Sequence, residues 1–417
     1  MTIRRFNKII IAFATISLSI FILTGCDNLL EGSVESITAH QAAPFVRPPV
    51  EQTTVSDYDE FLNEIIALIT LHETSGQILY YSRDGEDVQA EMERAVNEIK
   101  NNHPLGAFAV VDIIANATRI VTHYEVDIEI EYKRTKEQMD SIINVSAELG
   151  VMNNLLDIMS QYKDEAFLRS RLQLSEEDIT EIVKEIYYRN PRRVVMLPIV
   201  TLEVFPEHGT DRIHIIQFGY SESSSVLQRF GELLEIYVQR NAELAEGNTE
   251  SEILLSLINS LIESTIFDEG AARTIHVHGA QNLAATAYGA LVRGSAVGEG
   301  FAMAFKALAD ELGFDCRVVL GYHDGQVHAW NIISLYGDFY HVDAAMSRVN
   351  GIETAFLKTD ADFEEMLYTW DMENTVRCEG ELTLDDIQGL GETDEPDEGD
   401  ESEGNDEPNS ENNGEEN

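Results

Sequence analysis

The sequence has little positive charge and little cysteine. Its 417 residues include 28 Lys+Arg against 75 Asp+Glu, which gives a formal net charge of −47. A nucleic-acid-binding protein needs a basic stripe to displace counterions from phosphate, and no such stripe is visible, so we exclude DNA and RNA as partners. Three cysteines are too few for a disulfide-stapled scaffold. The hydrophobic fraction of 44% is ordinary for a folded protein and excludes a wholly disordered chain.

The N-terminus lacks an apolar run long enough for a confident membrane span. An apolar run over residues 9–23, broken only by Thr15, Ser17 and Ser19, follows three basic side chains. A run of roughly 15 residues is typical of a signal-peptide core. The run ends in Leu23-Thr24-Gly25-Cys26, which resembles the bacterial lipobox. The resemblance implies that residues 1–25 are a signal peptide, that Cys26 is lipidated, and that the protein is anchored on the extracellular face of a bacterial cell membrane. An uncleaved anchor helix or a coincidental cysteine is the alternative.

Two further segments have the composition of non-globular chain. Residues 26–55 contain three prolines and little periodicity, so we expect a tether between the lipid and the first folded element. Residues 379–417 contain 17 acidic residues and no basic residue. Such a segment cannot bury enough apolar surface to offset its ordering entropy, which predicts a disordered tail. The tail is either a solvated solubilising segment or a weak binder of cations or basic wall components.

Residues 56–240 alternate helical and strand patterns, which predicts an α+β region. Acidic and apolar residues alternate over 125–132, the period of two that marks a strand with one wet face. Helices are expected to end before Pro104 and Pro191, with strand-like runs following at 107–114 and 194–205 and a return strand at 212–220. The recurring order suggests a duplicated helix-hairpin unit, with a binding or spacer role and no identifiable chemistry.

Residues 250–375 have a different pattern. Apolar residues between 253 and 262 lie on one helical stripe, and the Ala- and Gly-rich residues 286–312 contain a second, longer helix. The runs 317–320, 328–335 and 338–342 look like consecutive strands. This pattern predicts a separate domain of helices and sheet.

Three phrases of this domain carry a specific resemblance: Val297-Gly298-Glu299-Gly300-Phe301-Ala302, His328-Ala329-Trp330-Asn331 and Tyr340-His341-Val342-Asp343. Over residues 252–348 the chain resembles the transglutaminase-like superfamily, whose core is papain-like. The resemblance implies that a helix bearing the nucleophile position packs on an antiparallel sheet. In that family a cysteine at a helix N-terminus is held as a thiolate by the helix dipole and a nearby imidazolium. By position, His328 matches the histidine that transfers the proton, Asp343 the aspartate that orients it, and Trp330 an aromatic beside the cleft.

The sequence departs from the family at the nucleophile. Where the family has Val-Cys-Glu-Gly-Tyr-Ala, this chain has Gly298 in place of the cysteine. Glycine has no side chain, so covalent catalysis from that position is impossible. After Asp343 the family usually continues with Thr-Trp, whereas this chain has Ala344-Ala345. Two departures at one site fit a fold that was retained after its reaction was lost.

Three other side chains are candidate nucleophiles or disulfide partners. Ser295 precedes the expected helix and would need a displaced loop to face His328. Cys316 is expected to be a small core residue, and Cys378 lies beyond the last family phrase, although a disulfide between these two is possible in a secreted protein.

The remaining histidines give no metal site. His276 and His278 form an H-x-H pair without further converging ligands, so we expect solvated loop histidines. His341 is expected to be structural. The sequence predicts no cofactor and no metal.

Taken together, these features predict a lipid-anchored pseudoenzyme that keeps the family's cleft as a binding site for peptide or protein segments near the cell wall. Its cleft is expected to carry a retained His328 and Asp343. One alternative is a working cysteine-protease-like or amide-transfer enzyme with an unrecognised nucleophile. Another is an envelope scaffold whose cleft is filled by side chains.

Overall fold

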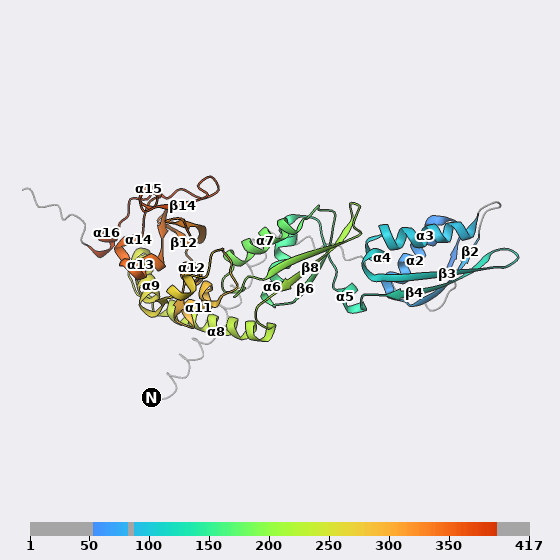
Figure 1. The fold of residues 1–417 in the computed structure, drawn as a ribbon, viewed down its shortest axis with the longest axis horizontal. Helices are drawn as coiled ribbons and strands as arrows, with labels where there is room; N and C mark the ends of the chain where they lie inside the picture. Colours follow the sequence, from blue (N-terminus) through green and yellow to red (C-terminus); the bar gives the residue numbers. More distant parts are fainter. Residues whose placement is uncertain (1–52, 82–86, 390–417) are drawn as a thin grey trace, which may run out of the picture. The chain divides into compact units, whose positions relative to one another are not determined.

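The computed structural model describes residues 53–81 and 87–389 (Figure 1). The predicted signal peptide, Cys26, most of the tether and the tail beyond residue 389 lie outside the described residues. The chain divides into two units: residues up to 155 with 164–178 and 200–218, and residues 156–163 and 179–199 with 219 onward. No helix within 53–81 and 87–389 is both long and apolar enough to cross a membrane.

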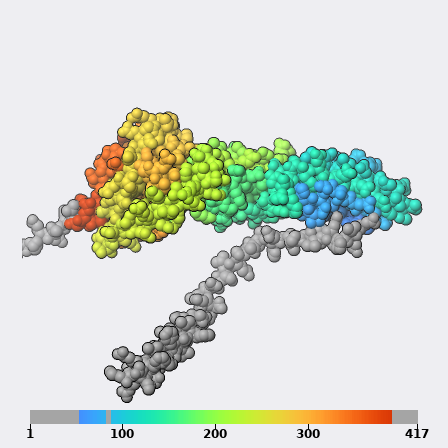
Figure 2. Space-filling model, turned by 90° about the horizontal axis from the view of Figure 1, so that it is seen from below, coloured from blue at the N-terminus to red at the C-terminus, as the bar shows by residue number. Residues whose placement is uncertain are grey.

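The first unit begins with a four-stranded sheet in the order β1-β2-β4-β3, with β1 parallel to β2 and the other pairs antiparallel. Its residues 53–81 and 87–155 are coloured blue to teal in Figure 2. Alternation on β4 buries Val126, Ile128 and Ile130 and leaves the acidic residues between them exposed, as the period of two predicts. The elements are β1 (Thr53–Val55), α2 (Tyr58–Leu71), β2 (Ser75–Tyr80), α3 (Val88–Asn102), α4 (Pro104–Ala109), β3 (Val110–Arg119) and β4 (Tyr124–Tyr132).

Two sequence expectations are corrected in this sheet. Thr53–Val55 is a strand and not tether, because the three residues pair with β2 and Val55 is buried. The strand expected from residue 107 begins at Val110, because Pro104 starts a short helix whose first turn needs no proline N–H.

A second sheet in the order β5-β6-β8-β7 follows the same sequence of strands and helices. Here too the first two strands are parallel and the second strand is antiparallel to the last. The strand expected from residue 194 begins only at Ile199. Duplication of the helix-hairpin unit stays a prediction. The elements are α5 (Lys136–Asp140), β5 (Ile143–Val145), α6 (Glu148–Ser160), β6 (Glu165–Ser170), α7 (Glu176–Arg189), β7 (Ile199–Phe205) and β8 (Arg212–Gly219).

The second unit contains the helix that carries Gly298, packed on an antiparallel sheet in the order β13-β12-β11-β14. Its helices are α8 (Ser224–Glu243), α9 (Glu250–Ser264), α10 (Glu269–Ala272), α11 (Ala287–Leu291), α12 (Gly298–Glu311), α13 (Ala344–Asn350), α14 (Ile352–Ala355), α15 (Asp360–Glu365) and α16 (Leu384–Gln388), with the 3-10 turn η1 (Leu283–Ala285). Its strands are β9 (Ile266–Phe267), β10 (Ser295–Ala296), β11 (Cys316–His323), β12 (Gln326–Leu335), β13 (Asp338–Val342) and β14 (Tyr368–Trp370).

Helix α12 forms the centre of this unit. Its residues from Gly298 to Ala309 are buried, and small alanines and glycines let α8, α9 and α11 approach on one side while β11 and β12 pack on another. The helix-on-antiparallel-sheet arrangement confirms the predicted α+β class.

The domain boundary expected between residues 240 and 250 is corrected. The second unit also contains residues 156–163, 179–199 and 219–249. The physical reason is that α8 covers α11 and α12, with the Phe230 and Tyr288 rings stacked at a centroid distance of 4.2 Å. Amphipathic periodicity predicts that α8 has a buried face, but it does not say which core that face covers.

The prediction that disorder begins at residue 379 is wrong. Residues 379–389 are described and end in α16, which begins with a capping box at Thr383. The backbone N–H of Leu382 donates to the Tyr340 hydroxyl at 3.3 Å, and Gly380 lies against the Tyr340 ring. Tertiary contact with β13 therefore orders a stretch that its acidic composition marks as non-globular.

Candidate functional site

The residues of interest meet where α12 begins beside the sheet. Gly298 is the first residue of α12, and Val297 caps the helix without a side-chain hydrogen bond. His328 pairs with Gly321 across β11 and β12, and Asp343 directly follows β13 as the N-cap of α13. Antiparallel pairing of β12 with β13 brings the histidine and the aspartate from separate sequence phrases to one place.

The His328 and Asp343 side chains are hydrogen-bonded. His328 Nε2 donates to Asp343 Oδ2 at 2.5 Å, and the Tyr368 hydroxyl donates to the same oxygen at 2.7 Å. The Met346 backbone N–H donates to Oδ1 at 2.9 Å, which caps α13. Asp343 is 1% exposed. Burial alone raises the pKa of Asp343, but the His328 charge and the hydrogen bonds outweigh it and hold the pKa below its usual value.

The carboxylate also fixes the histidine tautomer. A carboxylate can only accept, so the proton of the neutral ring is on Nε2 and the Nδ1 lone pair is free. Nδ1 faces Gly298: a methyl group on the Gly298 Cα would lie 2.5 Å from both Nδ1 and Cε1. The imidazole therefore occupies the space that a side chain at position 298 would need.

The ring borders a cleft of about 850 Å³. Among the described residues that line it, none is Cys, Ser, Thr or Lys, so the cleft wall offers no thiol, aliphatic hydroxyl or amine nucleophile. The lining is formed by Phe267, Ala272, Arg273, Ile275, His276, His278, Val297, Gly298, Glu299, Tyr322, His323, Asp324, Gly325, Gln326, Val327, His328, Ala329, Ala345, Met346, Val349 and Asn350.

The alternative nucleophiles lie elsewhere. The Ser295 hydroxyl donates to Asp268 Oδ2 at 3.3 Å, and Ser295 does not line the cleft. Cys316 and Cys378 are both buried and free, so the disulfide considered from the sequence is not formed. Burial raises the pKa of the Cys316 thiol, and burial followed by the Asp360 charge raises that of Cys378 to about 12. Both thiols are therefore held neutral and unreactive.

The expectation of solvated loop histidines is wrong for His278. His276 is exposed, whereas His278 is half-buried and donates from Nε2 to the Gly321 carbonyl at 3.2 Å. Burial lowers the pKa of His278, as it does that of His323, whose ring centroid lies 5.8 Å from that of His328. Sequence reasoning gave His323 no role, although its position diagonally across the hairpin from His328 follows from the strand register.

Glu299 was also missed. It follows Gly298 on α12, lines the cleft and is only 5% exposed. Burial raises its pKa to about 7 against the lowering effect of hydrogen bonds from the Gly279 N–H and the Tyr188 hydroxyl. A glutamate in the first turn is favoured by the helix dipole whether or not it is buried, so the sequence held no signal for this environment.

Trp330 was predicted to be a cleft residue, but it does not line the cleft. Its side chain is fully buried and lies behind His328, with ring centroids 6.3 Å apart. Residues on a strand alternate between faces, yet β12 is buried on both, so the family position alone did not distinguish core from cleft. The indole N–H donates to His341 Nδ1 at 2.9 Å.

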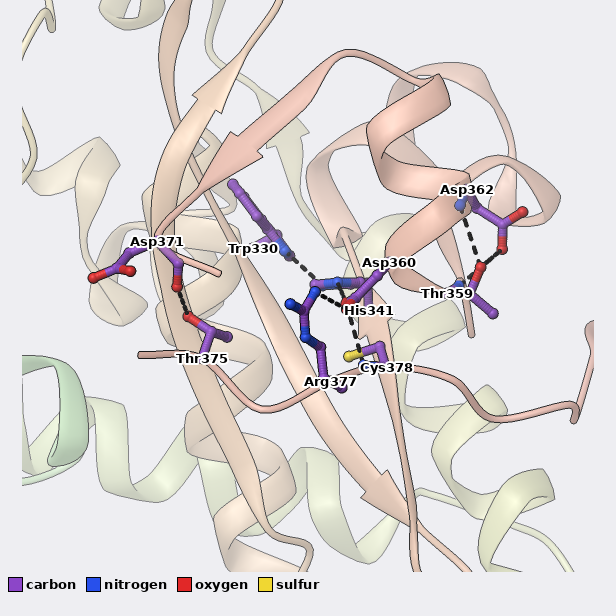
Figure 3. A network of polar contacts seen from close by, with 9 residues as sticks. All are labelled: Trp330, His341, Thr359, Asp360, Asp362, Asp371, Thr375, Arg377 and Cys378. Atoms are coloured by element: carbon purple, nitrogen blue, oxygen red, sulfur yellow. Dashed lines mark hydrogen bonds and ion pairs between the residues drawn. The ribbon is translucent and has the colours of Figure 1, made fainter. Parts of the chain in front are cut away.

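His341, Asp360 and Cys378 are ligand-type side chains whose donor atoms lie within 4.8 Å of one another (Figure 3). Trp330 can only donate, so Nδ1 of His341 keeps its lone pair for that bond and the proton is on Nε2, which donates to Asp360 Oδ1 at 3.0 Å. Both ring nitrogens are thus engaged, and the Arg377 guanidinium lies 3.3 Å from Asp360 Oδ2. The arrangement is a hydrogen-bond network that binds the 377–378 backbone to β13, and it does not fit a cation.

Asp343→Asn is expected to destabilise the second unit by about 3–5 kcal/mol, because the amide keeps only one acceptor oxygen and its NH2 group then faces either the Met346 N–H or the His328 and Tyr368 donors. Denaturant unfolding of the full chain measures the change, with Asp324→Asn as the matched control on an exposed turn. The folded pKa of Asp343 is depressed, so its stabilisation exists above the unfolded pKa and is lost as pH falls through the folded value. The difference between the variants therefore narrows at acid pH. Equal stability of the two variants at pH 7 contradicts the buried pairing.

Asp360→Asn is expected to lower the free energy of unfolding by about 3 kcal/mol, since the amide keeps only one acceptor oxygen and its NH2 group then faces either Arg377 or the His341 and Cys378 N–H donors. Asp371→Asn, an exposed change in the same region, is the control. Zinc chloride is expected to leave the thermal midpoint of the wild type unchanged. A zinc-dependent rise that Asp360→Asn abolishes would identify a metal site instead.

Comparison with known proteins gives a family match over part of the chain. Residues 241–344 match the transglutaminase-like superfamily. Among solved structures, a TGase is 12% identical, with 52% of this chain and 60% of that chain covered and a TM-score of 0.26. A candidate cysteine protease from Cytophaga hutchinsonii is 13% identical, with coverages of 41% and 66% and a TM-score of 0.23. A candidate protease from Parabacteroides distasonis is 7% identical, with coverages of 67% and 42% and a TM-score of 0.21.

The matched region thus spans 60%, 66% and 42% of those three chains, less than two thirds of each. No curated protein matches this chain.

Proposed function

Because residues 241–344 form a transglutaminase-like domain, we propose that this domain is a pseudoenzyme whose cleft binds peptide or protein segments. The observation that carries the proposal is the contact between Gly298 and His328. The imidazole lies where a nucleophile's side chain would begin, 2.5 Å from the position of a Cβ. A site that closes over the missing side chain has no room for the thiol that family chemistry requires.

The retained histidine and aspartate do not restore that chemistry. An oriented imidazole raises the reactivity of a neighbouring thiol or hydroxyl by taking its proton, and it needs such a group within hydrogen-bond reach. Among the described cleft-lining residues there is no Cys, Ser, Thr or Lys. This argues against the alternative of a cysteine-protease-like or amide-transfer enzyme with an unrecognised nucleophile.

The cleft surface supports a peptide-like ligand. Apolar side chains such as Ile275 and Met346 alternate in its walls with hydrogen-bonding groups. Large apolar residues are also exposed at its edge, with Tyr322 49% and Val349 59% exposed. Exposed apolar surface that borders a polar cleft is typical of an interaction site. An open volume of about 850 Å³ argues against a scaffold whose cleft is filled by side chains.

The location follows from the N-terminal sequence. A lipobox-like phrase ending in Cys26 supports a lipid anchor on the extracellular face of a bacterial cell membrane. From there the cleft would meet protein segments of the envelope.

Restoring the thiol tests the pseudoenzyme. Gly298→Cys is expected to gain labelling by iodoacetamide, and adding His328→Ala is expected to reduce that labelling because the imidazole lowers the thiol pKa. Gly298→Ala is the matched control: it carries the same Cβ without sulfur and reports background labelling of other cysteines. Both Gly298 variants are expected to lose about 1–3 kcal/mol of stability, since the His328 ring must move.

The decisive comparison uses the wild type. We expect no hydrolysis or crosslinking of casein or of glutamine- and lysine-containing peptides by the wild-type chain. Wild-type activity that His328→Ala abolishes overturns the pseudoenzyme proposal.

Val349→Glu tests the binding surface. Fluorescence anisotropy with labelled extended peptides rich in Leu and Phe is expected to show roughly tenfold weaker binding, because a carboxylate replaces apolar surface at the cleft edge. Val111→Glu, the same change at an exposed site in the first unit, is expected to leave the affinity unchanged. Equal affinities of both variants and the wild type contradict the cleft as the binding site.

A further inference from the structure

Glu299 has an environment that the pseudoenzyme proposal does not use. Its carboxylate accepts the Gly279 N–H at 3.1 Å on each oxygen, and the Tyr188 hydroxyl donates to Oε1 at 3.0 Å. Within the described parts of the chain no Lys or Arg forms an ion pair with it. A buried carboxylate that is hydrogen-bonded but lacks a counter-charge is costly in its ionised form.

The Gly279 bond holds one wall of the cleft. Residues 273–282 join α10 to η1, and Ile275, His276 and His278 from this segment line the cleft. Gly279 has φ +72°, and a Cβ there would lie 2.3 Å from Leu197, so only glycine fits at this point of the wall. His278, the preceding residue, donates to the Gly321 carbonyl opposite His328. The Glu299 carboxylate therefore holds the wall segment at Gly279, next to the residue through which the segment contacts the sheet.

We propose that Glu299 is a positioning residue whose ionised carboxylate holds the 273–282 wall of the cleft through the Gly279 N–H. This contact is called the clasp below, and we propose that protonation of the carboxylate weakens it. The inference deepens the proposed function, because the wall belongs to the binding cleft. It does not require that a peptide be the ligand.

The acid–base chemistry of the carboxyl group determines whether the hydrogen bond to Gly279 strengthens or weakens as pH rises. When ionised, both oxygens accept and the Gly279 N–H is shared between them. When protonated, one oxygen becomes a donor and the charge-assisted character of the remaining bond is lost. The titratable groups on the surrounding elements are Tyr187 and Tyr188 of α7, His278 of the wall and His328 of β12.

As pH rises, the clasp is expected to strengthen while the free energy of unfolding of the whole chain falls. Burial raises the folded pKa of Glu299 to about 7, above its unfolded value. Protonation therefore favours the folded state: the stabilisation is fully present below the unfolded pKa and is lost as pH rises through about 7. Over the same range the wall becomes more tightly held. A purely structural glutamate would not give this opposition.

Hydrogen exchange of the Gly279 amide tests the clasp on the full chain without a ligand. Protection factors, corrected for intrinsic exchange, are measured from pH 5.5 to 8.5. The wild type is expected to gain about fivefold in protection between the acid and alkaline limits, since a charge-assisted bond replaces a neutral one. Glu299→Gln keeps the shape and is expected to show the acid-limit protection at every pH. Its unfolding free energy is expected to lack the corresponding decline as pH rises to about 7.

Tyr188→Phe is the second variant, used if Glu299→Gln does not fold. The hydroxyl bond lowers the Glu299 pKa, so its removal is expected to shift the midpoint of protection to higher pH. A flat wild-type profile, a Glu299→Gln profile with the wild-type midpoint, or an unshifted midpoint in Tyr188→Phe overturns the clasp. None of these results bears on peptide binding, and failed peptide binding would leave the exchange profile intact, so the two proposals fail separately.

Discussion

The Asp343 carboxylate receives hydrogen bonds from His328 on β12, from Tyr368 on β14 and from the Met346 N–H in α13. It thereby joins the two strands on either side of β11 to the helix that follows β13. The same contact sets the imidazole tautomer and turns Nδ1 toward Gly298. The orientation of the ring and the closure over the missing side chain both depend on this one buried acceptor.

A retained histidine and aspartate are therefore weak evidence of catalysis in this domain. Removing one member of a buried charged or hydrogen-bonded group leaves the others unsatisfied, at a cost of several kcal/mol. Asp343 caps α13 and holds Tyr368 whether or not a nucleophile is present. Loss of a cysteine removes a small side chain at the end of a helix, whereas loss of the aspartate would disrupt three elements. The pair can persist for stability after the reaction has gone.

The sequence predicted what depends on local pattern and motif order. The alternation on β4, the α+β class and the phrases around Gly298, His328 and Asp343 could be read from residues alone, and the antiparallel register then accounts for how the last two meet. The sequence expectations that were wrong concern residues whose environment depends on tertiary contacts. The half-burial of His278 needs Gly321 from a strand more than forty residues away, and the order of residues 379–389 needs Tyr340. Composition carries no information on such partners.

Two buried carboxyl groups of one domain have opposite electrostatics. Asp343 accepts from an imidazole and two further donors, and its pKa is held low. Glu299 has hydrogen-bond donors but no counter-charge, and its pKa is raised to about 7. Across neutral pH the group that orients the His328 ring stays ionised, while the group that holds the 273–282 wall changes charge. Ring and wall are thus controlled by separate acceptors. In the binding cleft without catalysis that we propose, the wall responds to pH while the floor around Gly298 keeps its geometry.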